Sequence, residues 1–243
     1  MALQLEVIAF NVESCATIAK TGAHRVELCM NPQEGGTTPS EGFVKLARQL
    51  LSIDLFPIIR PRGGDFFYTD MEIDCMKHDI RMCKDLGCDG VVLGLLNENG
   101  TVNVEQTQKL VDLAYPLEVT FHRAFDRVLD PFSALEDIIR TGCTRILTSG
   151  LQPTAFEGKD LIRQLVHRAD GRISVMPGSG VRASNIREIA LDTRAEEFHT
   201  SARTFQSSRM LFHNPALAED AGYVVASHEE ISDCLQSLRQ VAE

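Results

Sequence analysis

Short apolar runs that recur along the whole chain constrain its fold more than any other feature. Eight runs rich in Val, Ile, Leu and Phe begin at intervals of 20 to 35 residues, and we predict that each is a β-strand. Each interval has room for one helix and two short loops, which is the connection that parallel strands require. The predicted strands are 5–10, 25–29, 55–60, 90–95, 117–122, 145–150, 173–178 and 197–202.

Eight strand–helix units without an internal linker predict one α/β domain with the (β/α)8 TIM-barrel fold. A doubly wound open sheet is the alternative. We expect the single domain to cover residues 1–243 and to be irregular after the last strand. There, residues 203–226 form a long connection with little helical periodicity, and residues 227–242 form a C-terminal helix.

Charge and composition argue against several classes of function. The chain has 34 Asp and Glu against 24 Lys and Arg, and a net charge of −10 is unsuited to a general nucleic-acid binder. No apolar run approaches the length of a membrane span, and the chain does not begin with the pattern of a secretory signal. Seven cysteines without a regular framework suit reduced thiols, so we expect a cytoplasmic protein.

Charged and titratable side chains lie within several predicted strands, although the interior of a barrel should be mostly apolar. They include Glu6, Glu27, Arg60, His122 and His199. A closed barrel has no exposed edge, so side chains on the inner faces of different strands meet in one lumen. Because buried charges are costly unless they are paired, two interpretations stay open. One is a structural network, for instance Glu27 with Arg60, and the other is a polar binding site at the barrel mouth.

Three of these residues are candidates for proton transfer. We expect Glu27, His122 and His199 to lie on the same rim, where a carboxylate and two imidazoles could act as acids or bases. His122 could also bind a metal ion, and Asp126 could orient its ring. For each histidine, a purely structural role in the core is the alternative.

Two loops have features of an anion-binding site. Arg60 and Arg62 precede two glycines, so guanidinium groups and backbone N–H groups could face one anion. Gly178, Ser179 and Gly180 follow the seventh predicted strand, in the region where many TIM barrels bind phosphate. A plain turn is the alternative for the segment with Arg60 and Arg62.

The segments around these residues resemble the CutC family of copper homeostasis proteins. The similarity is collinear, spans roughly residues 4–215, and implies a cytoplasmic TIM-barrel protein that is commonly oligomeric. It also implies a proposed role in binding Cu(I), with no reaction firmly established. The matching segments are 25–29 (RVELC), 34–40 (EGGTTPS), 57–66 (PIIRPRGGDF), 119–126 (VTFHRAFD), 147–150 (LTSG) and 197–202 (EFHTSA).

Cys29 carries the copper prediction. It ends the second predicted strand and matches a proposed copper ligand of the family, and thiolate is a soft ligand that suits Cu(I). A second proposed ligand of the family, a cysteine at the end of the first strand, is Ile8 in this chain. A further ligand would then come from Met30, a histidine or a second subunit.

We therefore expect a homo-oligomeric copper homeostasis protein that binds Cu(I) through Cys29 and contacts neither nucleic acid nor membrane. The alternative is a TIM-barrel enzyme of unknown reaction that acts on a small anionic or phosphorylated compound at the barrel mouth. In that case Arg60, Arg62 and residues 178–180 would hold the anion, and Glu27, His122 and His199 would transfer protons.

Overall fold

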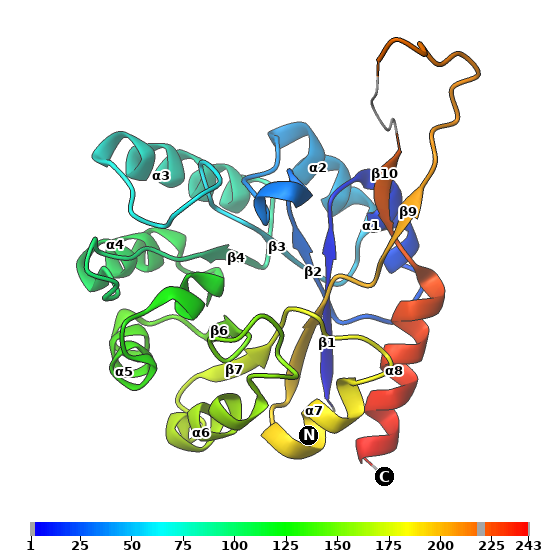
Figure 1. Cartoon of the computed structure of the whole chain (residues 1–243). Helices are drawn as coiled ribbons and strands as arrows, with labels where there is room; N and C mark the ends of the chain where they lie inside the picture. The colour runs from blue at the N-terminus through cyan, green and yellow to red at the C-terminus, as the bar shows by residue number, and fades with distance from the viewer. Residues whose placement is uncertain (1–2, 218–221, 243) are drawn as a thin grey trace.

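The computed structural model describes residues 3–217 and 222–242, and it shows eight parallel strands enclosed by helices (Figure 1). This arrangement confirms the predicted TIM barrel, and each observed strand overlaps one predicted run. The strands are β1 (Gln4–Ala9), β2 (Arg25–Leu28), β3 (Asp54–Pro57), β4 (Gly90–Leu93), β5 (Glu118–Phe121), β6 (Arg145–Thr148), β7 (Ser174–Pro177) and β8 (Glu197–Thr200).

The barrel wall consists of two four-stranded parallel sheets. Their strand orders are β3-β2-β1-β8 and β4-β5-β6-β7. A parallel bridge between Ile58 and Val92 connects the β3 side to the β4 side, and β7 lies beside β8. Because β1 pairs with β8, the first and last strands of the repeat are neighbours, as a barrel requires and an open sheet does not.

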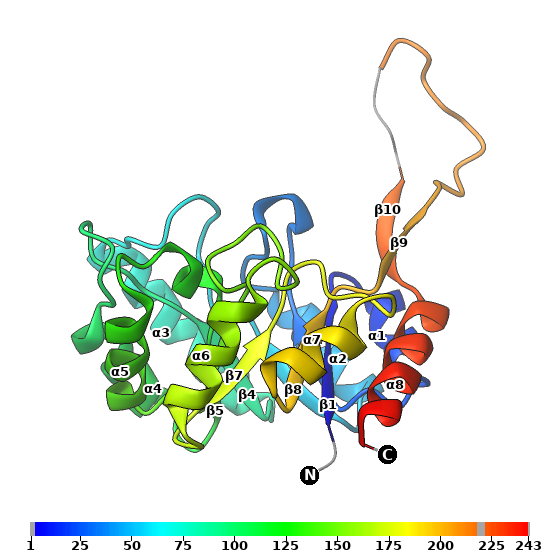
Figure 2. The same cartoon turned by 60° about the horizontal axis from the view of Figure 1, so that its bottom comes forward.

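Helices cover the outside of the barrel, and the termini lie together at the end where the strands begin (Figure 2). No helix within the described ranges has the length and apolarity that a membrane span needs. The helices are α1 (Val12–Ile18), α2 (Glu41–Leu50), α3 (Asp70–Asp85), α4 (Val104–Ala114), α5 (Pro131–Thr141), α6 (Lys159–Ala169), α7 (Ile186–Thr193) and α8 (His228–Ala242), with short 3-10 helices η1 (Pro32–Glu34) and η2 (Arg123–Arg127).

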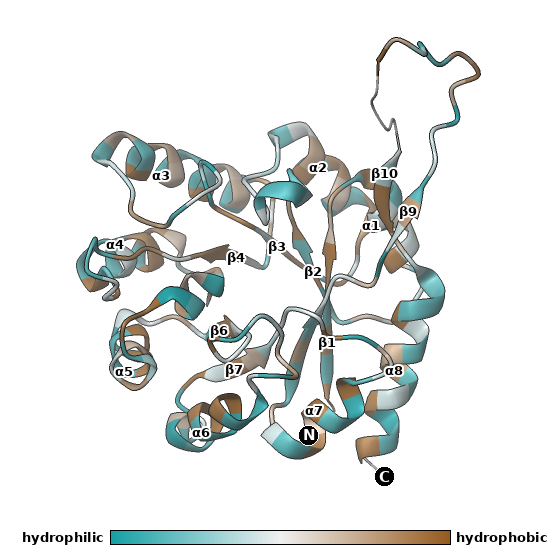
Figure 3. Cartoon of the chain, viewed as in Figure 1, coloured by the Kyte–Doolittle hydropathy of each residue, from teal (hydrophilic) through white to brown (hydrophobic). Residues whose placement is uncertain are grey.

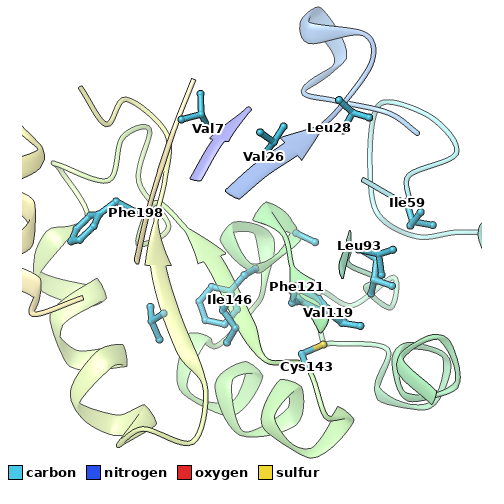
Figure 4. Close-up of a cluster of buried hydrophobic side chains, with 14 of the residues drawn as sticks. Val7, Val26, Leu28, Ile59, Leu93, Val119, Phe121, Cys143, Ile146 and Phe198 are labelled. Atoms are coloured by element: carbon cyan, nitrogen blue, oxygen red, sulfur yellow. The ribbon is translucent and has the colours of Figure 1, made fainter. Parts of the chain in front are cut away.

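The main hydrophobic core lies between the strands and the helices. Val7, Val26 and Phe121 belong to this buried cluster and come from different strands (Figure 4). Side chains alternate along a strand, so the residues between them point into the barrel. A smaller apolar cluster is separate from the main core and consists of Cys29, Phe56, Ile58 and Val92, with Ile8 and Phe10 packed against it.

The long connection after β8 contains a hairpin that the sequence did not predict. Strands β9 (Arg203–Gln206) and β10 (Tyr223–Ala226) pair antiparallel, and residues 207–217 after β9 project away from the barrel (Figure 2). Residues 207–217 form no helix or strand, and apolar stretches are visible along them (Figure 3). Met210, Leu211 and Phe212 are exposed there, so an apolar loop projects on the side where the barrel strands end.

Candidate functional site

A small cavity lies where the barrel strands end. Its volume is about 100 Å³, and it is lined by four residues that the sequence singled out, namely Glu27, Arg60, His122 and His199. They reach it from β2, from the segment after β3, from the end of β5 and from β8. The remaining walls include Ile8, Ile58, Phe66 and Leu147. The cavity therefore combines apolar walls with convergent polar groups, as ligand sites do.

Two carboxylates flank His199. Its Nδ1 atom lies 2.7 Å from Oε1 of Glu6, and its Nε2 atom lies 3.7 Å from Oε2 of Glu27. The register of the barrel causes this arrangement, because Glu6 pairs with His199 across β1 and β8. With Glu6 as acceptor, Nδ1 carries a proton and Nε2 faces Glu27.

Burial and neighbouring charges separate the proton affinities of these groups. Burial would raise the pKa of Glu6, but the charge of Arg25 and the hydrogen bond with His199 lower it to about 2. Burial raises the pKa of Glu27 to about 7, against the opposing charge of His199. Burial would lower the pKa of His199, but the hydrogen bond with Glu6 and the charge of Glu27 raise it. Near neutral pH, Glu6 is thus ionised while Glu27 and His199 can exchange protons.

A buried ion-pair network holds Glu6 in place. The Nε atom of Arg25 donates to Oε2 of Glu6 at 2.5 Å, and its Nη2 atom donates to Glu197 at 2.5 Å. The Nε atom of Arg145 donates to the same oxygen of Glu197, also at 2.5 Å. Both guanidinium groups lie over the ring of Phe56. The structural network that the sequence left open thus involves Glu6 and Arg25, whereas no ion pair joins Glu27 to Arg60 within the described chain.

Arg60 differs from these arginines because its partners are backbone carbonyl groups. Its Nη1 atom donates to the carbonyl oxygens of Glu34 and Gly36, at 2.6 and 2.7 Å, and its Nη2 atom donates to that of Gly64 at 3.1 Å. The residue is 4% exposed. Within residues 3–217 and 222–242, no carboxylate forms an ion pair with it. Carbonyl dipoles fix the guanidinium without cancelling its charge, so the cavity wall keeps a net positive group.

His122 is a neutral imidazole. Its Nδ1 atom accepts the backbone N–H of Ala124 at 3.1 Å, at the start of η2. Burial, together with the charge of Arg60, lowers its pKa to about 3. The proton of the neutral ring is therefore on Nε2, which is buried and has no hydrogen-bond partner in the described part of the chain. A Cβ atom at Gly94 would lie 2.5 Å from Nδ1, so a glycine is needed where the ring packs against the end of β4.

Arg62 does not join Arg60, contrary to the sequence-based expectation. Its Nε atom donates to Oε1 of Glu72 at 2.6 Å, and its Nη2 atom lies 2.9 Å from Oδ1 of Asp65. These carboxylates lie within the loop after β3 and at the start of α3, and they hold the guanidinium outside the cavity. Anion binding by Arg62 stays a prediction, and in this structure its guanidinium is paired with Asp65 and Glu72 instead of lining the cavity with Arg60.

Asp126 does not orient His122 either. Its carboxylate accepts hydrogen bonds from the hydroxyl of Thr148, the backbone N–H and hydroxyl of Ser149, and the backbone N–H of Leu151. It also pairs with Arg123 at 2.7 Å. Asp126 thus ties η2 to the loop after β6.

The glycine-rich loop after β7 lies partly beside the site. A Cβ atom at Gly178 would lie 3.3 Å from the Cβ atom of His199. Ser179 and Gly180 do not line the cavity, and the Ser179 hydroxyl donates to the carbonyl of Pro153 at 2.9 Å. Anion binding by residues 178–180 stays a prediction.

Cys29 is fully buried and does not line the cavity. A Cβ atom at Gly36 would lie 3.2 Å from its Sγ atom, so the loop after β2 covers the thiol closely. Burial, with the charges of Glu27 and Glu6, raises its pKa well above the ordinary value. Metal binding needs the thiolate, which this environment disfavours. Within the described chain, the side chains close enough to share a metal ion are Glu6, Glu27 and His199, without Cys29.

Four residues in or beside the site were not predicted from the sequence as site residues, namely Glu6, Arg25, Glu197 and Phe66. Glu6 was noticed only as a polar strand residue, because its contact with His199 depends on how β1 and β8 pair. For Arg25 and Glu197, the spacing along the strand could have predicted a place near the site. Arg25 precedes Glu27 by two residues, and Glu197 precedes His199 by two, so each pair shares the inner face of its strand.

Comparisons with known proteins agree with the resemblance noted in the sequence. A family model described as the CutC family matches residues 3–204. A CutC protein of Parabacteroides distasonis is 49% identical over 228 residues, covering 93% of this chain and 94% of that protein. The copper homeostasis protein cutC homolog of Mus musculus is 47% identical over 228 residues, covering 94% and 83%. The crystal structure of a CutC protein from Streptococcus agalactiae has a TM-score of 0.79 and 35% identity, covering 82% of this chain and 98% of that one.

Proposed function

Since this chain belongs to the CutC family, we propose that it serves copper homeostasis, the role named for its mouse relative, indirectly as an enzyme. It acts on a small anionic or phosphorylated compound in the cavity at the end of the barrel strands. The buried guanidinium of Arg60 carries this proposal, because it has no carboxylate partner in the described chain. A buried charge without a counter-ion is costly, and a bound anion would compensate it.

Glu27 and His199 are the proton-transfer groups in this proposal. Glu27 lies in the cavity wall with its pKa raised to about 7 by burial, so it can accept and return a proton near neutral pH. Glu6 accepts a hydrogen bond from Nδ1 of His199 and thereby fixes the direction of the ring.

Thermal unfolding with added anions tests the binding step. We expect inorganic phosphate, pyruvate or 2-phosphoglycolate to raise the Tm of the wild type and of Arg62→Gln, the control in which the arginine outside the cavity is changed. Arg60→Gln should lose the effect. Glu27→Gln should strengthen it, because this change removes a negative charge from the cavity wall. The proposal fails if none of these anions stabilises the wild type, or if Arg60→Gln responds as the wild type does.

Direct Cu(I) binding through Cys29 is the second candidate, and the name of the mouse relative favours it. An anaerobic competition titration against a chromophoric chelator, on the wild type and Cys29→Ser, separates the two. We expect no stoichiometric binding that depends on Cys29, because the thiol is buried and stays protonated. Tight Cu(I) binding that collapses in Cys29→Ser would replace the enzyme proposal.

We also propose a cytoplasmic location and a homo-oligomeric state. The free thiols support the first, since all seven cysteines are unpaired. The exposed apolar side chains of residues 205–217 support the second, because such a surface on a monomer would contact water.

A further inference from the structure

We propose that the compound is a small carbonyl compound, that His122 polarises its carbonyl oxygen, and that Glu27 removes a proton from the adjacent carbon. This inference rests on the proposed function and specifies its substrate class and its reaction. It gives His122 a chemical role of its own, whereas the binding of an anion alone would give this residue no role.

The unpartnered nitrogen of His122 is the starting observation. The backbone N–H of Ala124 donates to Nδ1, so the neutral ring has its hydrogen on Nε2. That N–H group is buried and has no acceptor in the described part of the chain. Buried donors are almost always paired, so an unpaired one in a cavity wall indicates an acceptor that arrives with the ligand.

Arg60 lies on the same side of the cavity as His122. The ring of Phe66 contacts both, with its centroid 4.8 Å from that of His122 and 4.9 Å from the guanidinium carbon of Arg60. An oxygen that accepts the hydrogen bond from His122 would therefore lie near a fixed positive charge. Such a pair stabilises negative charge that develops on an oxygen during a reaction.

The acid–base pair reaches the cavity from other strands. Glu27 and His199 lie on β2 and β8, 3.7 Å apart, whereas His122 follows β5. Glu27 and His122 both line the cavity, and in this proposal the ligand contacts Nε2 of His122 through its oxygen and Glu27 through the neighbouring carbon. The volume of about 100 Å³ limits the reacting part to a small group.

The step is balanced without an oxidant or a reductant. The carboxylate of Glu27 takes the proton, and the electron pair of the C–H bond forms a carbon–carbon double bond. The π electrons of the carbonyl group move to its oxygen, which becomes an enolate oxygen bound by His122 and stabilised by Arg60. Return of the proton from Glu27 to the carbon that lost it restores the carbonyl compound, and in D2O a deuteron returns in its place.

Exchange of carbon-bound hydrogen with solvent tests this step directly. Pyruvate and dihydroxyacetone phosphate are incubated with the protein in D2O, and their proton NMR signals are followed. We expect the wild type to exchange at least one of them well above the buffer rate. Glu27→Gln should slow exchange by at least about 100-fold, and His122→Asn by about 100-fold.

The variants separate chemistry from folding. Asn at position 122 keeps an acceptor for the N–H of Ala124 but removes the Nε2 donor, and His167→Asn changes an exposed histidine on α6 as a control. Exchange should also fall as the pH drops below about 7, where Glu27 becomes protonated. Undiminished exchange in His122→Asn would overturn the role of His122. Binding of either probe without exchange would overturn this inference and leave the proposed function standing, whereas neither binding nor exchange would overturn both.

Discussion

At the scale of single residues, Glu6 and Glu27 show how neighbouring groups shift the pKa values of two carboxylates in one lumen in opposite directions. Glu6 has Arg25 and His199 as partners and is held ionised. The charges of His199, at 3.7 Å, and of Arg25 lower the pKa of Glu27, but burial outweighs them. Ionised Glu27 therefore costs the folded protein stability, as residues kept for function often do.

Glu27→Gln should stabilise the protein at alkaline pH. The pKa of Glu27 is raised from 4.5 to about 7 in the folded state. Its protonated form therefore stabilises the fold fully below pH 4.5, and this stabilisation is lost as the pH rises through 7. Glutamine has no charge to bury, so at pH 8 the free energy of unfolding of the variant should exceed that of the wild type by about 3 kcal/mol. Urea unfolding followed by circular dichroism at pH 5 and pH 8 measures this. An equal difference at both pH values would show that the charge of Glu27 is not the cause.

Glu6→Gln should have the opposite effect. The pKa of Glu6 is lowered from 4.5 to about 2, so its stabilisation is present above pH 4.5 and is lost as the pH falls through 2. The variant leaves Arg25 buried without this carboxylate. Its free energy of unfolding at pH 7, measured by the same urea unfolding, should fall by about 3–5 kcal/mol. Glu105→Gln, at an exposed ion pair on α4, is the matched control and should change stability by less than about 1 kcal/mol. A loss no larger in Glu6→Gln than in the control would contradict the buried network.

At the scale of elements, close packing between neighbouring strands positions the site. Gly94 follows β4 and leaves room for the ring of His122. Gly94→Ala should displace the ring and cost about 1–3 kcal/mol of stability. The effect is measured from Tm and from the imidazole NMR signals of His122. Gly42→Ala on α2, where an added Cβ meets nothing within 4 Å, should stabilise by about 0.5–1 kcal/mol. Unmoved His122 signals in Gly94→Ala would contradict the close contact.

The barrel strands were predictable because their apolar runs repeat with helices between them. The convergence of Glu27, Arg60, His122 and His199 was predictable from their places near strand ends. The position of Arg62 was not, because competition from Asp65 and Glu72 depends on how the loop folds. The hairpin was missed for another reason: β9 and β10 have four residues each, and only Ala226 among them is buried, so burial leaves little periodicity in them.

At the scale of the whole molecule, residues 207–217 after β9 project away from the barrel (Figure 2). Leu211 and Phe212 belong to this segment and are exposed. We expect the double variant Leu211→Ser, Phe212→Ser to shift the protein toward the monomer in light scattering after size exclusion, with its Tm at high dilution unchanged. An oligomer of unchanged mass would place the interface elsewhere.

Arg60 and His122 line the same cavity, and in the described chain Arg60 has no carboxylate partner and Nε2 of His122 has no hydrogen-bond acceptor. A ligand bound there would supply both. The measurement that tests this most directly is a crystal structure of the protein grown with saturating pyruvate. We predict ligand density in the cavity, with an oxygen within hydrogen-bond distance of Nε2 of His122. An empty cavity, or pyruvate bound only at the surface, would contradict it.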